Sequence, residues 1–259
     1  MLSPELIAMI KRISWIAMIF MAAALFITTV EKKRSRTVDA VDIRIAALST
    51  GDNLITREDV FVAIERSFGH RVLGLPIGAL NVEKVERVLE ADPFIRDADV
   101  FIDALNTVQI EVSQREPILR VIDQNGLNYY LDHEGKMMPL SPHFTARVLV
   151  ATGAIPPFDP GYQSRKGNRI KKIYEMCQII LQDELLEVLI GQIDINSKGE
   201  ISMVPILGNQ TIEFGDLVEV SDKIFRLKTF YAEAMPRLGW KKYKTINLKF
   251  RNQVVCKKR

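Results

Sequence analysis

Apolar and charged positions divide the chain into one uncharged segment near its start and a longer body in which short apolar patterns alternate with charged residues. Residues 13–30 are 18 residues without a charge. As an α-helix they would extend about 27 Å, which matches the hydrocarbon core of a bilayer. The apolar residues 6–10 precede this segment. The sequence therefore predicts one transmembrane helix at residues 13–30, with the function in the body that follows.

A removable signal peptide is the alternative reading of this segment. Cleavage would need small residues after the apolar core, but residues 22–24, the alanine run, lie in its middle. An uncleaved anchor is therefore favoured. Basic residues stand on both sides of it, at Lys11 and Arg12 and again within residues 32–36. Counting them slightly favours a cytoplasmic body, and charge alone leaves the orientation open.

Residues 37–122 show a β-α-α-β-β pattern. Residues 37–48 alternate as a strand does, and Thr56 and Asn81 are suitable N-cap residues for two helices that end at Gly69 and before Pro93. Residues 95–102 and 107–112 then form two β-rich runs. Because both helices come together and no glycine-rich phosphate loop follows the first strand, a nucleotide-binding fold is disfavoured. The pattern predicts a small sheet with two helices on one face.

The second half predicts a β-rich domain with flanking helices. Strands are expected at residues 119–122, 128–131, 147–151, 192–196, 200–205, 211–214 and 244–255. One amphipathic helix is marked by apolar residues from Ile170 to Leu181, and whether it extends to Leu189 stays open. Ser221 is expected to cap another helix that ends at Met235. The fold class is therefore α+β, with a mostly antiparallel second domain.

Composition narrows the range of partners. The net charge is +3, and much of the basic excess lies at residues 32–36 and 257–259. The first cluster is best explained by contact with lipid head groups. The body has no basic stripe interleaved with aromatic residues, so nucleic-acid binding is not predicted. Cys177 and Cys256 are the two cysteines, and Cys177 falls on an apolar helical pattern typical of a buried thiol. Whether the two form a disulfide stays open.

No catalytic constellation stands out. The three histidines are His70, His133 and His143, and none lies at metal-ligand spacing from another histidine or a cysteine. His133 between Asp132 and Glu134 is more simply a polar turn. The sequence therefore predicts no enzyme, cofactor, metal or small-molecule substrate.

Three stretches, taken in order, resemble the FtsQ/DivIB family of bacterial cell-division proteins. They are residues 108–117, which end in Arg115-Glu116-Pro117, residues 128–138 with an Asp-x-x-Gly turn, and residues 212–230 with 243–255. The resemblance covers nearly the whole chain. It implies a cytoplasmic N-terminus at residues 1–12, the helix at 13–30, a linker at 31–36, a POTRA domain at 37–117 and a β domain at 118–259. It also implies a cell inner membrane protein whose body is periplasmic, although the basic run at residues 32–36 departs from the family.

The resemblance further implies a non-enzymatic scaffold of the divisome that acts during septum formation. In this family the end of the β domain receives FtsB, which associates with FtsL. From the residues alone, the segment 244–255 is more simply a structural strand. The resemblance favours instead an edge strand that pairs with an extended partner. Its partner-binding residues would be Ile246, Leu248, Lys249, Phe250, Arg251 and Val254.

The POTRA unit is expected to provide a second binding surface, and the scaffold function has two rivals. The helix and strand around residues 85–96 would form a groove through which the POTRA unit contacts upstream division proteins. The rival function is a POTRA-type protein-transport or envelope-assembly factor, which usually carries several such units or a membrane barrel. A wall-acting enzyme is a third reading, for which a nucleophile or metal set is missing from the sequence.

Overall fold

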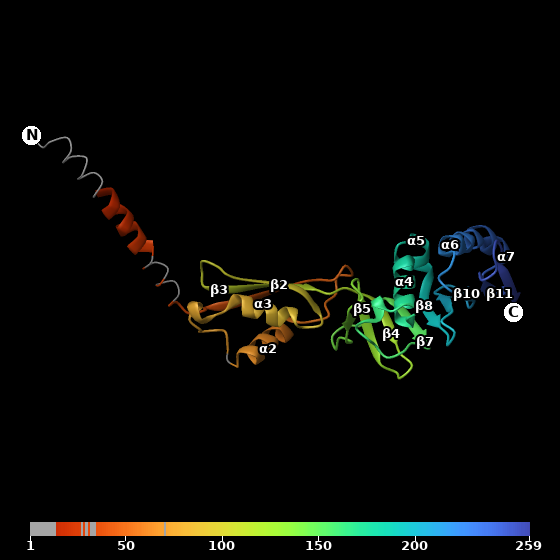
Figure 1. Cartoon of the computed structure of the whole chain (residues 1–259), viewed down its shortest axis with the longest axis horizontal. Coiled ribbons are helices and arrows are strands. Elements are labelled where there is room, and N and C mark those ends of the chain that lie inside the picture. The colour runs from red at the N-terminus through yellow and green to blue at the C-terminus, as the bar shows by residue number, and fades with distance from the viewer. Residues whose placement is uncertain (1–13, 27, 29–30, 32–34, 70) are drawn as a thin grey trace, which may run out of the picture. The chain divides into compact units, whose positions relative to one another are not determined.

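The computed structural model describes residues 14–26, 28, 31, 35–69 and 71–259, and these divide into two compact units (Figure 1). Unit 1 contains the described residues up to Ala47 and Ile55–Gln114, and unit 2 contains Leu48–Leu54 and Arg115–Arg259. The loop Leu48–Leu54 therefore groups with the second unit although it lies within the sequence of the first.

Residues 14–26 form a helix whose large apolar side chains are exposed, including Trp15 and Phe20. Among the described residues, no helix combines the length and hydropathy that a membrane span requires. Within the predicted anchor at residues 13–30, positions 13, 27, 29 and 30 lie outside the described residues. The flanking stretches 6–12 and 32–34 lie outside them too. The anchor therefore stays a prediction.

Unit 1 confirms the predicted β-α-α-β-β order. Its elements are β1 (Ala40–Ala46), α2 (Arg57–Phe68), the 3₁₀ turn η1 (Ile77–Ala79), α3 (Val82–Glu90), β2 (Ile95–Ile102) and β3 (Thr107–Gln114). In this part of the chain, β3 is central, with β1 parallel on one side and β2 antiparallel on the other. The expected sheet with two helices is thus present.

Local capping explains both helices of unit 1. Thr56 Oγ1 accepts the amide of Asp59, whose side chain in turn accepts the Thr56 amide, so both halves of a capping box are present. Asn81 caps α3 through one bond, in which its Oδ1 accepts the amide of Lys84 at 2.9 Å. Gly69 ends α2 at φ 73°, a left-handed conformation that glycine adopts without strain. These caps were predictable because they depend on neighbours in the sequence.

Unit 2 is built on a large sheet with helices. Its elements are β4 (Pro117–Ile122), β5 (Asn128–Asp132), β6 (Met137–Met138), β7 (Leu149–Gly153), η2 (Tyr162–Ser164), α4 (Arg169–Leu181), α5 (Glu184–Leu189), β8 (Ile190–Ile195), β9 (Ile201–Pro205), β10 (Thr211–Gly215), α6 (Val220–Thr229), a π-helical turn η3 (Phe230–Ala234), α7 (Met235–Leu238), β11 (Tyr243–Asn247) and β12 (Val255–Lys258).

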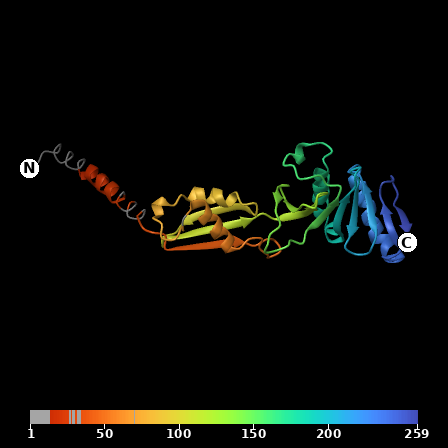
Figure 2. The ribbon, with the colours of Figure 1, turned by 90° about the horizontal axis from the view of Figure 1, so that it is seen from below.

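The strands of unit 2 follow the order β12-β11-β10-β9-β8-β7-β4-β5-β6 in the described part of the chain (Figure 2). The pairs β10–β11, β7–β8 and β4–β7 are parallel, and the other pairs are antiparallel. The sheet is therefore mostly antiparallel, as the sequence predicts.

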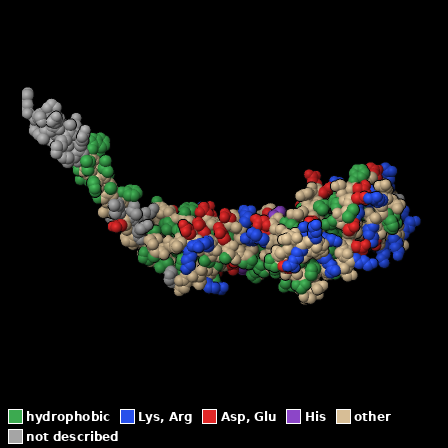
Figure 3. All heavy atoms as spheres, viewed as in Figure 1, with side chains coloured by type: hydrophobic (Ala, Val, Ile, Leu, Met, Phe, Trp, Pro, Cys, Tyr) green, Lys and Arg blue, Asp and Glu red, His purple; other side chains and the backbone are tan. Residues whose placement is uncertain are grey.

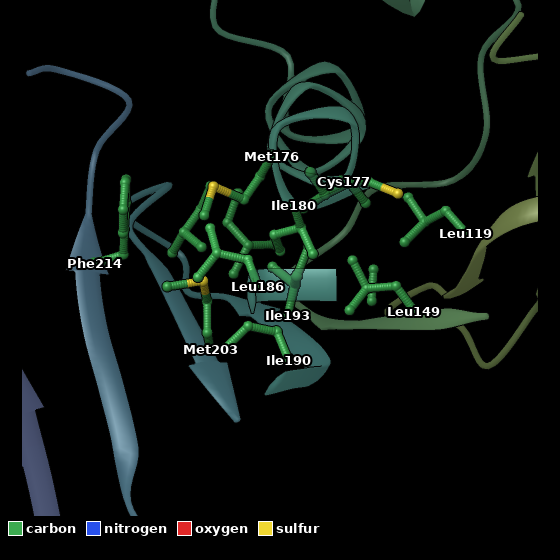
Figure 4. Packing of buried hydrophobic residues seen from close by; sticks show 14 of the residues in the cluster. Leu119, Leu149, Met176, Cys177, Ile180, Leu186, Ile190, Ile193, Met203 and Phe214 are labelled. Carbon is green, nitrogen blue, oxygen red and sulfur yellow. The ribbon is translucent and has the colours of Figure 1, made fainter. Parts of the chain in front are cut away.

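Helix α4 covers this sheet and supplies much of its core. From α4, Met176 points toward Phe214, Cys177 toward Leu119, and Ile180 toward the strands beneath the helix (Figure 4). Each of these side chains is less than 10% exposed. Burial of an aliphatic side chain of this size contributes about 1.5–3 kcal/mol to the stability of the fold, so these contacts hold α4 against the strands. Unit 1 has a separate core between its helices and its own sheet.

The helix predicted at Ile170–Leu181 is confirmed as α4, and it does not extend to Leu189. The Asp183 carboxylate accepts the amides of Leu185 and Leu186 and starts the separate helix α5. The prediction for the next helix was wrong in its cap. Ser221 does not cap the next helix. The capping position is Glu219 at φ 53°, which provides no side-chain cap, and Ser221 lies inside α6. The helical stretch also changes to a π-turn at Phe230 before it reaches Met235.

The segment Arg115-Glu116-Pro117 is held by charge at the start of unit 2. Arg115 Nη1 lies 3.1 Å from Asp132 Oδ2, and both side chains are largely buried, at 15% and 6% exposure. Asp132 Oδ1 also accepts the amides of Glu134 and Lys136, which fixes the turn after β5. The Glu116 carboxylate accepts the Ser49 hydroxyl. The Arg-Glu-Pro segment and the Asp-x-x-Gly turn, separate in the sequence, are therefore joined in space.

Candidate partner-binding edge

Strand β12 forms one end of the large sheet. It pairs antiparallel with β11, and no strand among the described residues pairs with its other side. The amide of Arg259 bonds inward to the Lys242 carbonyl at 3.3 Å. Because successive amides of a strand point to opposite edges, those of Cys256 and Lys258 face the open side. This edge could pair with an added strand.

The continuous strand predicted at residues 244–255 was wrong. Strand β11 ends at Asn247, and residues 248–254 form a turn that leads back into β12. The Asn247 side chain accepts the Lys249 amide at 2.9 Å, and Asn252 adopts φ 56°. Asparagine tolerates both roles, and each diverts the backbone from an extended course. The edge is therefore β12 and not the predicted strand.

Arg226 of α6 holds this turn in place. Its guanidinium donates to the carbonyls of Phe250 at 2.9 Å, Gln253 at 2.5 Å and Leu248 at 3.3 Å. Asp222 Oδ2, 2.8 Å from its Nε, orients the group, and the Arg226 side chain is only 10% exposed. One charged side chain therefore satisfies three carbonyls of the turn. Arg226 was not predicted from the sequence, because nothing local links it to residues 248–253.

The structure separates the six predicted partner-binding residues into two groups. Ile246 and Leu248 are fully buried in the core of unit 2, and Val254 packs against the same core. Their side chains pack toward the core of unit 2 and do not face a partner. Lys249, Phe250 and Arg251 lie in the turn, and the Phe250 side chain remains 49% exposed. Of the three, Phe250 presents the largest apolar surface for a partner.

Both predicted cations of the site already have partners within the chain. Arg251 pairs with Glu219 at the start of α6. Lys249 Nζ lies 3.7 Å from Glu200 and 4.0 Å from Glu213. The pKa of Glu200 is lowered, first by the hydrogen bond from Asn196 and then by the Lys249 charge. Contacts of these cations with acids on a partner would compete with these internal pairs.

The surface around β12 is basic and carries some apolar groups. Lysine and arginine side chains gather over the C-terminal end of the chain (Figure 3). The exposed basic residues of β11, β12 and their flanks are Lys241, Lys242, Lys244, Lys257, Lys258 and Arg259. Among them Trp240 and Val255 are 40% and 42% exposed. Basic side chains on an edge strand disfavour nonspecific pairing with other strands. They would also attract a partner segment that carries acidic residues.

Cys256 lies on β12 and is partly buried against the core. Burial raises the pKa of its thiol. Cys177 is fully buried in α4, where burial raises its pKa to about 12. Both thiols are free, so the disulfide that the sequence left open is not formed in this structure.

The groove expected around residues 85–96 is partly occupied by its own side chains. Val85 and Leu89 are buried beneath α3. The Glu86 carboxylate accepts the Val100 amide of β2 at 3.0 Å. An extended peptide that paired with β2 at this position would have to displace Glu86.

Comparison with protein-family models identifies both units. A model described as FtsQ/DivIB, C-terminal related, matches residues 116–257, which is more than half of the chain. The chain belongs to the FtsQ/DivIB family. A POTRA-like domain model matches residues 37–113. A search of the curated proteins finds no match. FtsQ/DivIB and POTRA-type domains are non-catalytic scaffold types, and the family is one of cell-division scaffolds.

Proposed function

We propose that this FtsQ/DivIB protein is a non-enzymatic scaffold of the divisome that receives its partner by strand addition on β12. The supporting observation is that no strand in the described part of the chain pairs with the outer side of β12, and that the turn leading into β12, held by Arg226, exposes Phe250. Strand addition supplies main-chain hydrogen bonds, and an adjacent aromatic side chain adds an apolar anchor.

The partner at this edge is an FtsB-like protein associated with an FtsL-like protein. Family membership supports this choice, and the basic surface around β12 favours an extended segment that carries acidic residues. The POTRA-like unit contacts other division proteins, and together these contacts link early and late members of the complex during septum formation.

The protein is a single-pass protein of the cell inner membrane with a periplasmic body. The uncharged run at residues 13–30 supports the anchor, and family membership supports the orientation. Fusions of alkaline phosphatase and of a cytoplasmic fluorescent reporter after Arg259 test this topology. Phosphatase activity supports the periplasmic body, and fluorescence without phosphatase activity would contradict it.

Binding of purified FtsB-like and FtsL-like proteins to the full chain tests strand addition. Lys258→Pro removes an amide that faces the open edge, so we expect loss of binding, whereas Lys258→Ala keeps the amide and serves as the control. Phe250→Ala should weaken binding by about tenfold or more, because an aromatic anchor is lost. Leu248 is unsuitable for a proline test, since it lies in the core. Wild-type binding by both Lys258→Pro and Phe250→Ala would refute the model.

A further inference from the structure

Four lysines from separate parts of unit 2 line one cavity of about 460 Å³. Lys172 comes from α4, Lys198 from the turn between β8 and β9, Lys223 from α6, and Lys249 from the turn that precedes β12. The acids that line the same cavity are Glu200 and Asp216. Four positive charges thus face two negative ones, and the cavity has an excess of positive charge.

Lys223 places a cation deep in this cavity wall. Its side chain is 7% exposed, and its ammonium lies 5.0 Å from the centre of the Phe214 ring. The ammonium donates to the Asp216 carbonyl at 2.9 Å and to Asp216 Oδ1 at 3.1 Å. Because an ammonium has three donors, one remains after these two bonds. Asp216 is itself 61% exposed and therefore well solvated, so it neutralises the buried charge only in part.

Two glycines allow the neighbouring lysines to lie over the backbone. A Cβ at Gly215 would meet Lys249 Cγ at 2.8 Å, and a Cβ at Gly199 would meet Lys172 Nζ at 3.1 Å. Lys172 Nζ donates to the Gly199 carbonyl at 3.2 Å. Gly199 and Gly215 have positive φ, at 79° and 81° respectively. A side chain at either glycine would therefore meet the lysine that lies over it.

Lys249 also borders a second, adjoining cavity of about 270 Å³, which includes Glu213. Its ammonium is only loosely paired, at 3.7 Å from Glu200 and 4.0 Å from Glu213. Both distances exceed the usual length of a charge-assisted hydrogen bond. A ligand with a higher charge density could draw Lys249 toward the larger cavity.

We propose that this lysine-lined cavity binds a diphosphate group. Lysine is a common point-charge ligand for phosphoryl oxygens, and the four lysines that line the cavity come from separate elements of unit 2. A water molecule takes up roughly 30 Å³ of liquid, so the cavity has room for two linked phosphoryl groups. The group is carried either by a soluble molecule or by a lipid. The site shares Lys249 with the turn that leads into β12, but it does not require strand pairing on β12.

Calorimetric titration of the purified full chain with inorganic diphosphate, at matched ionic strength, tests the site. We expect a Kd of about 1 mM or lower. Lys198→Gln changes an exposed turn residue, and Lys172→Gln/Lys198→Gln removes two of the four charges. The double variant should bind at least about tenfold more weakly. Lys166→Gln, an exposed lysine outside the cavity, should bind as the wild type does.

Absence of binding to wild type, or equal binding by Lys198→Gln, the double variant and Lys166→Gln, would overturn the site. Circular dichroism of each variant confirms that the fold is retained, and Lys198→Gln remains informative if the double variant does not fold. Titration with farnesyl diphosphate in detergent micelles distinguishes a soluble ligand from a lipid-linked one. Binding equal to that of inorganic diphosphate supports a soluble ligand, and binding at least about tenfold tighter supports a lipid-linked one.

Discussion

At the scale of single residues, the buried pair of Arg115 and Asp132 should be the most sensitive electrostatic contact of unit 2. Loss of Arg115 would leave the Asp132 carboxylate buried at 6% exposure with only amide donors. Removal of one partner from a buried pair costs about 3–5 kcal/mol. We therefore expect Arg115→Met to lower the free energy of unfolding of unit 2 by this amount. Urea denaturation followed by Trp240 fluorescence, in a Trp15→Phe background, measures it.

The exposed pair of Lys136 and Glu134 provides the control in the same turn. Both side chains are more than half exposed, at 59% and 58%. Surface pairs of this kind contribute at most about 1 kcal/mol. Lys136→Met should therefore have little effect. Equal effects of Arg115→Met and Lys136→Met would mean that burial does not strengthen the role of Arg115.

Tyr162 makes the stability of unit 2 sensitive to alkaline pH. Its hydroxyl donates to the Gly135 carbonyl at 2.9 Å, and burial raises its pKa from 10.0 to about 12. The unfolded chain loses this proton first, so the contribution of Tyr162 is complete below pH 10 and decreases as the pH rises toward 12. The loss amounts to roughly 2–3 kcal/mol.

Tyr162→Phe isolates this effect. Below pH 10 the variant should be less stable than wild type by about 1 kcal/mol, because the Gly135 carbonyl loses its donor. Between pH 10 and 12 the difference should shrink and change sign, since the variant has no hydroxyl to ionise. Denaturation curves across this range provide the measurement. A constant difference would mean that the Tyr162 pKa is not raised by folding.

Which residues could be predicted depended on whether their role is local. Thr56 and Asn81 were recognised as caps because a cap is defined by residues three positions away. Arg226 was missed because its carbonyl partners lie 22–27 positions further on. Glu219 was missed because its φ of 53° is unusual for a glutamate.

At the scale of elements, the turn at residues 248–254 should depend on Arg226. Without its guanidinium, the carbonyls of Leu248, Phe250 and Gln253 lose a shared donor. Arg226→Met should therefore open the turn and increase tryptic cleavage after Lys249 or Arg251 by about tenfold or more. Timed proteolysis with mass spectrometry measures the rate. Arg237→Met is the control, because Arg237 is 79% exposed. Equal cleavage rates in the two variants would contradict the role of Arg226.

The same turn shows why the final strand was misread. Apolar and polar residues alternate from Thr245 to Arg251, across the end of β11, and neither glycine nor proline occurs within residues 244–255. The break is made by Asn247 and Asn252, whose effect depends on a side-chain hydrogen bond and a left-handed conformation. The β-α-α-β-β order, in contrast, could be predicted because strong caps and a proline mark its boundaries.

At the scale of the whole molecule, the proposed anchor and the binding edge should be separable. Unit 2 has its own core and its own sheet, so removal of residues 1–36 should leave β12 intact. A chain that begins at Thr37 is expected to bind the FtsB-like partner in solution with a Kd within about threefold of the full chain, because no contact of the edge is lost. Titration calorimetry of the two proteins tests this.

In cells the truncated chain should fail to support division, because confinement to the membrane raises the effective concentration of weakly binding partners. An unrelated transmembrane helix fused before Thr37 should restore division if the anchor acts only by confinement. Colony formation after depletion of the native protein provides the measurement, with Phe250→Ala in the fused chain as a control that retains the anchor. Rescue by the chain without any anchor would mean that membrane attachment is dispensable, and failure of the foreign anchor would mean that residues 1–36 make contacts of their own.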